Sequence, residues 1–174
     1  YVKYAPSKEL SDLSDYYQVS GDEIAVYLDG ESQDEKGLLR QNQPYLPLTW
    51  VNQKLNERFY WDEQEKILVY TLPESIVYMN ADSRGDDGLP LFLEDADGIY
   101  LSKDLILTYT DIRVTSFLED EIHRLFISTC WETETWNVLK RKGAVREKGG
   151  IKSPIVALQQ EGAKVRVLDS MDYW

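Results

Sequence analysis

The residues best suited to chemistry in this chain are carboxylates grouped in two short stretches. Residues 82–87 and 94–98 each place acidic side chains around a glycine. Clustered carboxylates at a tight turn supply the oxygen ligands that Ca²⁺ prefers. Neither stretch has the regularly spaced acidic positions and distal glutamate of a calcium loop. We therefore interpret both as solvated turns, and we predict no metal site and no cofactor.

Other groups that could act in catalysis are scattered. Glu63, Glu65 and residues 119–121 lie in predicted turns, whereas glycoside hydrolysis needs two carboxyl groups that face each other across a cleft. His123 and Cys130 are single residues of their kind, and no Gly-x-Ser-x-Gly elbow occurs. We expect His123 to be exposed on a strand and Cys130 to be a buried apolar group. The chain is predicted to have no catalytic residue and no enzymatic activity.

Aromatic side chains offer a different kind of site. The 12 tyrosines and 5 tryptophans far outnumber the 4 phenylalanines. Tyrosine and tryptophan combine an apolar ring with a polar tip, and when exposed they can stack on sugar rings. The candidate glycan-binding residues are Tyr60, Trp61, Trp131 and Trp136. Core packing is the alternative for Trp61 and Trp50, because both lie within the repeated pattern described below, whereas Trp131 and Trp136 lie outside it.

Charge and hydropathy restrict the class of partner. With 31 acidic and 19 basic residues the formal charge is −12, which opposes a polyanion such as nucleic acid. The basic run at 140–142 is interpreted as a solvated linker. No apolar run is long enough to cross a membrane. Because the chain opens at Tyr1, we expect an export signal or anchor upstream.

The elements that must position these candidates occur twice, about 55 residues apart. The first repeat has a strand at 24–28, a helix that begins at Pro47, and a hairpin of strands 59–62 and 66–72. The second has a strand at 91–93, a helix that begins at Ser102, and a hairpin of strands 113–117 and 124–129. Proline is tolerated in a first helical turn and serine caps one, so both fit a helix start. Duplicated packing without duplicated chemistry favours a scaffold.

We predict an α+β, strand-dominated protein. Its parts are a lead-in at 1–20 with one helix within 7–17, repeat units at 21–73 and 74–139, and a tail of short strands at 140–174. In the first hairpin, alternation places Phe59 and Trp61 on one face, and we expect Ile67 and Val69 opposite them.

Residues 24–71 resemble the copper amine oxidase N-terminal-like domain of many Gram-positive surface proteins. The matching segments are the turn at 29–30, the start of the helix at 45–48 and the strands at 59–62 and 67–70. The resemblance implies a stalk-like domain without copper or quinone chemistry. Residues 91–129 look like a divergent copy, in which Ser102 replaces Pro47.

The tail resembles the first half of a bacterial SH3-like domain, through Val145, the run 162–168 and Trp174. This implies an incomplete SH3-like β-barrel that follows the two small antiparallel sheet-plus-helix units. An incomplete barrel has open edges, so we expect the tail to be less ordered, or to pair with the first repeat or with a second copy of the chain.

Two stalk-like units before an SH3-like module resemble the N-terminal half of bacterial family 18 glycoside hydrolases, the chitinase-like class. The Asp-x-x-Asp-x-Asp-x-Glu motif of that family is absent here, so the resemblance implies a catalytic domain downstream. The leading expectation is a non-catalytic extracellular spacer, attached to the cell surface or cell wall, that targets cell-wall glycan such as peptidoglycan or a chitin-like polymer. The alternatives are a protein interaction or oligomerisation module, which would use exposed sheet edges, and a dedicated glycan-binding module, which would use exposed Trp and Tyr.

Overall fold

The computed structural model describes residues 5–130 and 135–167. The chain divides into two compact units: Val19–Cys130 forms the larger unit, and Tyr1–Gln18 with Trp131–Trp174 forms the smaller unit. The described residues are rich in strand and contain three short helices, as the predicted α+β, strand-dominated class requires. Within the described residues the sheets are open and none closes into a barrel. The predicted boundary between residues 73 and 74 lies inside the larger unit, so both repeats share one core.

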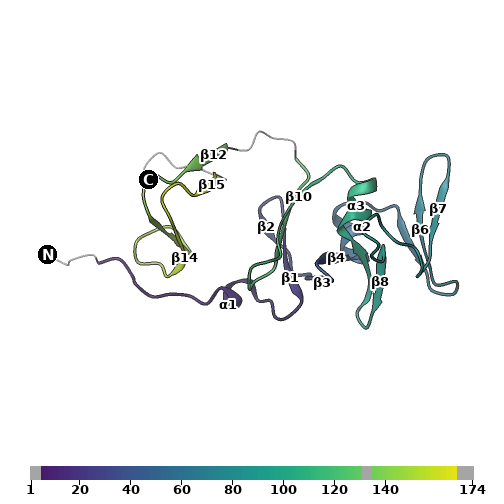
Figure 1. The fold of residues 1–174 in the computed structure, drawn as a ribbon, viewed down its shortest axis with the longest axis horizontal. Coiled ribbons are helices and arrows are strands. Elements are labelled where there is room, and N and C mark those ends of the chain that lie inside the picture. The colour runs from purple at the N-terminus through teal and green to yellow at the C-terminus, as the bar shows by residue number, and fades with distance from the viewer. Residues whose placement is uncertain (1–4, 131–134, 168–174) are drawn as a thin grey trace. The chain divides into compact units, whose positions relative to one another are not determined.

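The larger unit is built on an eight-stranded sheet in the order β10-β11-β1-β3-β4-β9-β8, with β2 also paired to β1 (Figure 1). Its strands are β1 (Glu23–Leu28), β2 (Glu31–Ser32), β3 (Gly37–Arg40), β4 (Gln43–Pro47), β8 (Phe92–Asp95), β9 (Gly98–Ser102), β10 (Arg113–Phe117) and β11 (Arg124–Ser128). The pairing of β1 with β11 is parallel, and the other pairings are antiparallel.

The centre of this sheet is a nearly symmetric junction between the repeats. Strands β4 and β9 run antiparallel with Leu46 directly opposite Leu101, and these side chains are 1% and 0% exposed. Pro47 comes directly after Leu46, and Ser102 comes directly after Leu101. Helices α2 (Leu48–Lys54) and α3 (Lys103–Tyr109) begin at the next residue in each case. The pair Leu46 and Leu101 therefore lies at an approximate two-fold axis that relates the two helices.

The helices begin where the sequence predicts. Ser102 caps α3, since its hydroxyl accepts a hydrogen bond from the Leu105 nitrogen at 3.2 Å. Pro47 occupies the same position before α2 and makes no side-chain cap. The two helices bury equivalent positions against the sheet, namely Trp50 and Val51 in α2 and Leu105 and Ile106 in α3.

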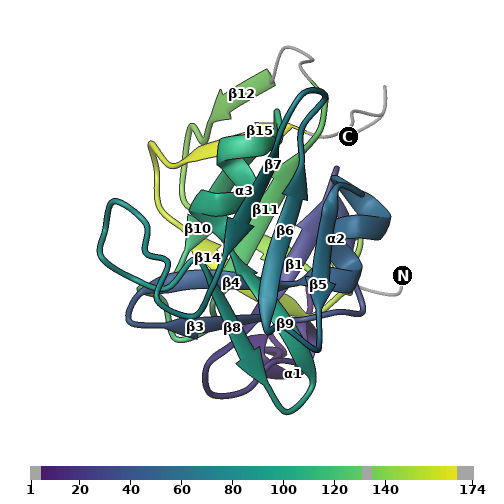
Figure 2. The same ribbon diagram turned by 90° about the vertical axis from the view of Figure 1, so that its right-hand side faces the viewer.

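A second, three-stranded sheet consists of β5 (Phe59–Asp62), β6 (Ile67–Thr71) and β7 (Ile76–Met79), and Figure 2 shows it with the strands upright. The expected pairing in its first hairpin is wrong, because Phe59 and Trp61 lie opposite Tyr70 and Leu68. The turn after Asp62 ends at Lys66, whose φ is 56°, and this sets a register one residue away from the expected one. A shift by one residue moves a strand's side chains to the other face.

The two repeats differ after their helices. Hairpin β10–β11 joins the large sheet through β1, whereas hairpin β5–β6 continues into β7 and forms a separate sheet. Before the helices, hairpin β3–β4 of the first repeat corresponds to β8–β9 of the second, since each leads directly into its helix. The strand at 24–28, aligned by sequence with 91–93, is instead the partner of β11.

A partly buried polar contact joins the ends of the two helices. The Asn56 amide nitrogen lies 3.0 Å from the Tyr70 hydroxyl, 2.9 Å from the Thr110 hydroxyl and 3.2 Å from the Tyr109 carbonyl. The rings of Tyr70 and Tyr109 stack with centroids 4.0 Å apart. The second sheet is thereby held against the end of α3 by both polar and aromatic contacts.

The smaller unit contains α1 (Leu13–Tyr17) and two small antiparallel sheets. One sheet pairs β12 (Thr135–Val138) with β15 (Lys164–Val167), and the other pairs β13 (Gly143–Arg146) with β14 (Ile155–Gln159). The predicted boundary at residues 139 and 140 separates β12 from its partner β15, so β12 belongs with the tail.

The lead-in covers one edge of this tail. The helix predicted within 7–17 is shorter, because Asp12 caps it and residues 7–11 are not helical. The Ile155 nitrogen donates to the Glu9 carbonyl at 2.8 Å, and the Ser11 nitrogen donates to the Ile155 carbonyl at 3.1 Å. The open edge expected for the tail is thus paired, at β14, with the lead-in.

A carboxylate clasp holds the β1–β2 turn to the end of β11. The Asp29 carboxylate accepts hydrogen bonds from the Thr129 nitrogen at 2.8 Å and from the Thr129 hydroxyl at 2.5 Å. The hydroxyl bond is the main reason that the pKa of Asp29 lies below its ordinary value of 3.8. The clasp therefore stabilises the fold while Asp29 is ionised.

We expect Leu101→Ala to lower the free energy of unfolding of the larger unit by about 2–5 kcal/mol, because it leaves a cavity at the junction of the repeats. Leu107→Ala is the matched control, since Leu107 is 38% exposed on α3, and it should cost less than about 1 kcal/mol. Urea unfolding followed by tryptophan fluorescence measures both. Equal losses for the two variants would show that the junction is not the core of a cooperative unit.

The clasp predicts a pH dependence. A carboxyl group with a lowered folded pKa adds stability above its unfolded value, and that stability is lost as the pH falls through the folded pKa. The free energy of unfolding of the wild type should exceed that of Thr129→Val by up to about 1 kcal/mol at neutral pH, and this difference should shrink below pH 3.8. Urea midpoints measured across this range test it, with Thr115→Val as control. A difference independent of pH would contradict the role of the Asp29 charge.

Removal of residues 1–11 should expose the edge of β14. Hydrogen exchange at the Ile155 amide should then accelerate, since its acceptor, the Glu9 carbonyl, is gone. Amides of β15, which pair with β12, serve as the internal control. Unchanged exchange at Ile155 in the shortened chain would show that the lead-in does not protect this edge.

Candidate binding face

Two of the four predicted glycan-binding residues, Tyr60 and Trp61, lie on opposite faces of one sheet. Tyr60 lies on β5 and is 63% exposed, while the neighbouring Trp61 points to the opposite face of the same sheet. Trp136 lies on β12 of the smaller unit and is 54% exposed. Trp131 lies outside the described residues. Of the three candidates that the structure describes, only Tyr60 belongs to the outer face of the three-stranded sheet.

Trp61 is held by contacts with neighbouring side chains of the fold. Its indole nitrogen donates to Glu63 at 2.7 Å, and its ring meets Phe92 edge-on with centroids 5.4 Å apart. The Lys66 ammonium lies 5.9 Å from the ring centroid. These contacts join the second sheet to β8, which fits the core-packing alternative for Trp61.

The predicted turn carboxylates take part in structural contacts. Hydrogen bonds from Lys66 first, and then from Trp61, lower the pKa of Glu63, which is the wrong direction for a general acid at neutral pH. Lys66 also donates to Glu94 at 2.8 Å. Its charge therefore links the turn after β5 to strand β8.

The two acidic stretches are likewise used by the fold. Asp95 lies 3.6 Å from Arg40. Asp87 and Asp104 both accept from the side-chain nitrogen of Gln43, at 2.8 and 3.0 Å, and Gln43 is 6% exposed. Burial, followed by the nearby charge of Asp87, raises the pKa of Tyr45. Among the described residues no group of three His, Cys, Asp or Glu side chains is arranged to hold a metal ion.

His123 and Cys130 lie at the two ends of β11. His123 is partly buried, and its carbonyl accepts from the Ala25 nitrogen at 2.9 Å, where the parallel pairing of β1 and β11 begins. Cys130 is exposed rather than buried as predicted, because β11 ends at Ser128 and the cysteine lies beyond the sheet.

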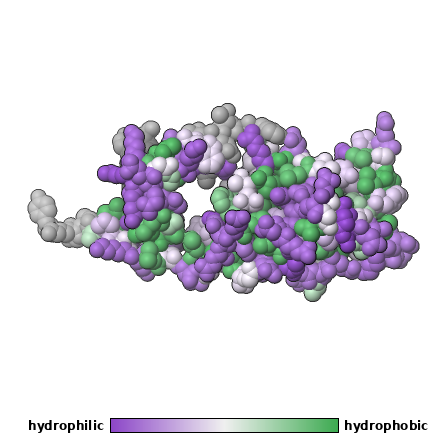
Figure 3. All heavy atoms as spheres, in the orientation of Figure 1, coloured by the Kyte–Doolittle hydropathy of each residue, from purple (hydrophilic) through white to green (hydrophobic). Residues whose placement is uncertain are grey.

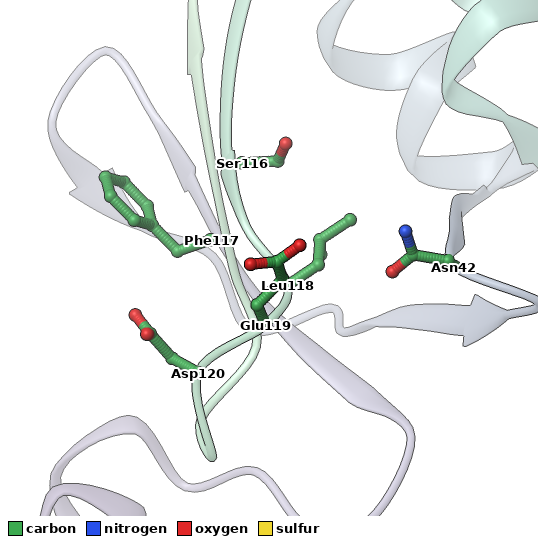
Figure 4. Close-up of a pocket in the computed structure, with 6 residues that line it drawn as sticks. All are labelled: Asn42, Ser116, Phe117, Leu118, Glu119 and Asp120. Carbon is green, nitrogen blue, oxygen red and sulfur yellow. The ribbon is translucent and has the colours of Figure 1, made fainter.

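An open hollow of about 320 Å³ lies between the end of β10 and the turn that joins β3 to β4 (Figure 4). Asn42 borders it on one side, and Ser116, Phe117 and residues 118–120 border it on the other. Asp120 is engaged with Arg124, whose guanidinium lies 4.7 Å from the Phe117 ring centroid. The hollow is open, and its polar lining comes mainly from one loop.

The outer face of the three-stranded sheet is the most distinctive exposed surface of the larger unit. We define the tyrosine face as the row of Tyr60, Val69 and Tyr78, which lie opposite one another on β5, β6 and β7. Tyr60 and Tyr78 are 63% and 65% exposed. Two strand spacings separate them, roughly 9.6 Å. Figure 3 shows hydrophobic residues in the region of the β6–β7 hairpin.

Polar groups flank the tyrosine face along β5. Alternation along the chain places Arg58 and Asp62 on the same side of the sheet as Tyr60. Arg58 is exposed, and its carbonyl accepts from the Thr71 nitrogen at 3.2 Å. Asp62 accepts from the nitrogens of Gln64 and Glu65. The surface thus combines two planar rings with charged groups that can form hydrogen bonds.

Tyr78 is the residue that the sequence reasoning missed. The run 76–78 is recognisable as a strand, but its partner and register are set by the turn at 72–75. Period-two alternation places Tyr78 on the same face as Ile76 and away from Met79, but all of these residues are large and mostly apolar, so the pattern does not indicate which face is exposed.

Comparisons with known proteins identify no relative of this chain. No family model matches the chain, and no curated protein and no solved structure is significantly similar to it. In the part of the chain that the structure describes, no helix is long and apolar enough to cross a membrane.

Proposed function

We propose that this chain is a non-catalytic accessory region that binds glycan through the tyrosine face. The observation that carries the proposal is the pair of exposed rings, Tyr60 and Tyr78, on one face of a sheet on either side of Val69. Each ring offers a flat apolar surface to the C–H face of a sugar, and each hydroxyl remains available to water or to a sugar hydroxyl.

The charge of the chain favours a neutral ligand. A formal charge of −12 repels a polyanion but leaves an uncharged polysaccharide unaffected. Arg58 and Asp62, on either side of Tyr60, can donate to and accept from sugar hydroxyls. Since the rings lie in one row across the strands, the glycan chain runs across β5, β6 and β7 rather than along them.

The cellular setting rests on the resemblances described above. The resemblance of its parts to stalk-like units and to an SH3-like domain supports a location outside a Gram-positive bacterium, as a spacer before a family 18 glycoside hydrolase domain. The order hairpin, helix, hairpin occurs twice in the larger unit, which supports a duplicated origin for its two halves. The contacts of Glu63, Glu94 and Asp87 support a structural rather than catalytic use of the carboxylates.

Binding to insoluble chitin and to peptidoglycan tests the proposal. We expect Tyr60→Ala and Tyr78→Ala each to weaken binding roughly tenfold, which corresponds to about 1.4 kcal/mol. Tyr16→Ala is the matched control, because Tyr16 is 47% exposed but lies in the smaller unit. Trp136→Ala tests the other described aromatic candidate.

Several results would contradict the proposal. Binding that survives the double change Tyr60→Ala and Tyr78→Ala would exclude the tyrosine face. Loss of binding in Trp136→Ala alone would assign the glycan to the smaller unit. Hydrolysis of either polymer by the isolated chain would show that it is an enzyme.

A protein interaction or oligomerisation module is a second candidate, and one observation favours it. Strand β7 pairs with β6 on one side, and the other side is an edge.

A further inference from the structure

The free edge of β7 has a defined hydrogen-bonding pattern. The Leu72 nitrogen donates to the Ser75 carbonyl at 2.9 Å, so this pair opens the β6–β7 ladder. Bonded and non-bonded pairs alternate along an antiparallel ladder. Val77 and Met79 therefore bond to β6, whereas the peptide groups of Ile76 and Tyr78 point away from it.

The other side of the sheet confirms this alternation. The Thr71 nitrogen donates to the Arg58 carbonyl at 3.2 Å, so Thr71 faces β5 and the adjacent Tyr70 faces β7. Tyr70 is the partner of Val77 in the register of the sheet. Both ladders thus assign the outward positions of β7 to Ile76 and Tyr78.

The two edges of the three-stranded sheet differ in the hydrogen bonds that their outward peptide groups make. On β5, the outward carbonyl of Phe59 accepts from the side chain of Asn52 on α2 at 2.9 Å. On β7, no hydrogen bond from the described residues reaches the peptide groups of Ile76 or Tyr78. The strand contains no lysine, proline or bulge, which are the usual protections of an edge. The side chains of Ile76 and Tyr78 are 52% and 65% exposed.

We propose that β7 pairs antiparallel with β7 of a second copy of this chain, with Val77 opposite the partner's Val77. In this register Ile76 lies opposite the partner's Tyr78, and both residues have outward peptide groups. The two symmetry-related pairs make four hydrogen bonds and join the three-stranded sheets into one of six strands. The alternative centre, Tyr78, would place Ile76 opposite Asn80, whose nitrogen already donates to the Ser83 hydroxyl at 3.0 Å.

Side chains select the same register. Centred on Val77, the pairing places Glu74 opposite Asn80, and Ile76 opposite Tyr78 as a β-branched and aromatic pair. Centred on Tyr78, it would place Glu74 opposite Asp82, and like charges directly opposite are destabilising. The Val77 register therefore combines the available hydrogen bonds with compatible side chains.

The contact is small, so the dimer is weak. Two four-residue strands bury less surface than a standard protein interface, and we expect a Kd of about 10 µM to 1 mM. Two copies that each carry a charge of −12 repel each other. Added salt screens this repulsion, so the dimer should strengthen as the salt concentration rises.

Sedimentation velocity over a concentration series of the full chain tests the proposal. Ile76→Pro removes the outward N–H of Ile76 but no bond to β6, and proline is accepted at such an edge position. Tyr78→Lys is a second variant that keeps the backbone intact and adds a charge at the edge. Tyr60→Lys is the matched control, because it adds the same charge to the same face but on β5. Wild type and Tyr60→Lys should dimerise, and the two β7 variants should remain monomeric.

Hydrogen exchange locates the contact. In dilute wild type the amides of Ile76 and Tyr78 should exchange quickly and those of Val77 and Met79 slowly. At high concentration Ile76 and Tyr78 should slow while the other two stay unchanged. A wild-type monomer at about 1 mM, or a dimer that persists in Tyr78→Lys, would overturn the proposal. Neither result depends on glycan, whose binding is tested by Tyr60→Ala.

Discussion

The pairing of β4 with β9 is the contact on which the larger unit depends. Each strand leads without a loop into a helix, so the register that sets Leu46 opposite Leu101 also sets where α2 and α3 begin. Because both leucines are fully buried, a slip by one residue would move them out of the core and misplace both helices together. The two repeats are therefore halves of one core.

The repeats are alike up to their helices and differ after them, and the difference leaves one face and one edge of the three-stranded sheet exposed. The second hairpin is absorbed by the large sheet through its parallel contact with β1. The first hairpin gains a third strand instead and keeps one face and one edge in solvent. The outer face of this sheet is exposed at Tyr60 and Tyr78. Its edge at β7 has no partner among the described residues, whereas Asn52 donates a hydrogen bond to the opposite edge, at β5.

Local signals allowed the sequence to predict local structure. Pro47 and Ser102 mark helix starts through backbone chemistry that acts within one turn, and alternation and turn residues locate both hairpins, although they give the wrong register for the first. The pairings of β1 with β11 and of β4 with β9 join distant segments, and no local pattern specifies them. The candidate site was predicted in part. Tyr60 lies on the exposed face, but Trp61 must point the other way because adjacent strand residues alternate, and Tyr78 depends on a register that only the turn determines.

The lead-in and the tail belong to one compact unit although the whole larger unit lies between them in the chain. During synthesis, residues 7–11 leave the ribosome long before their partner Ile155 is made. The larger unit has its own core and can fold in that interval, since domains generally fold in order of synthesis. The smaller unit cannot form until strand β15 (Lys164–Val167) has been made, so it forms after the larger unit.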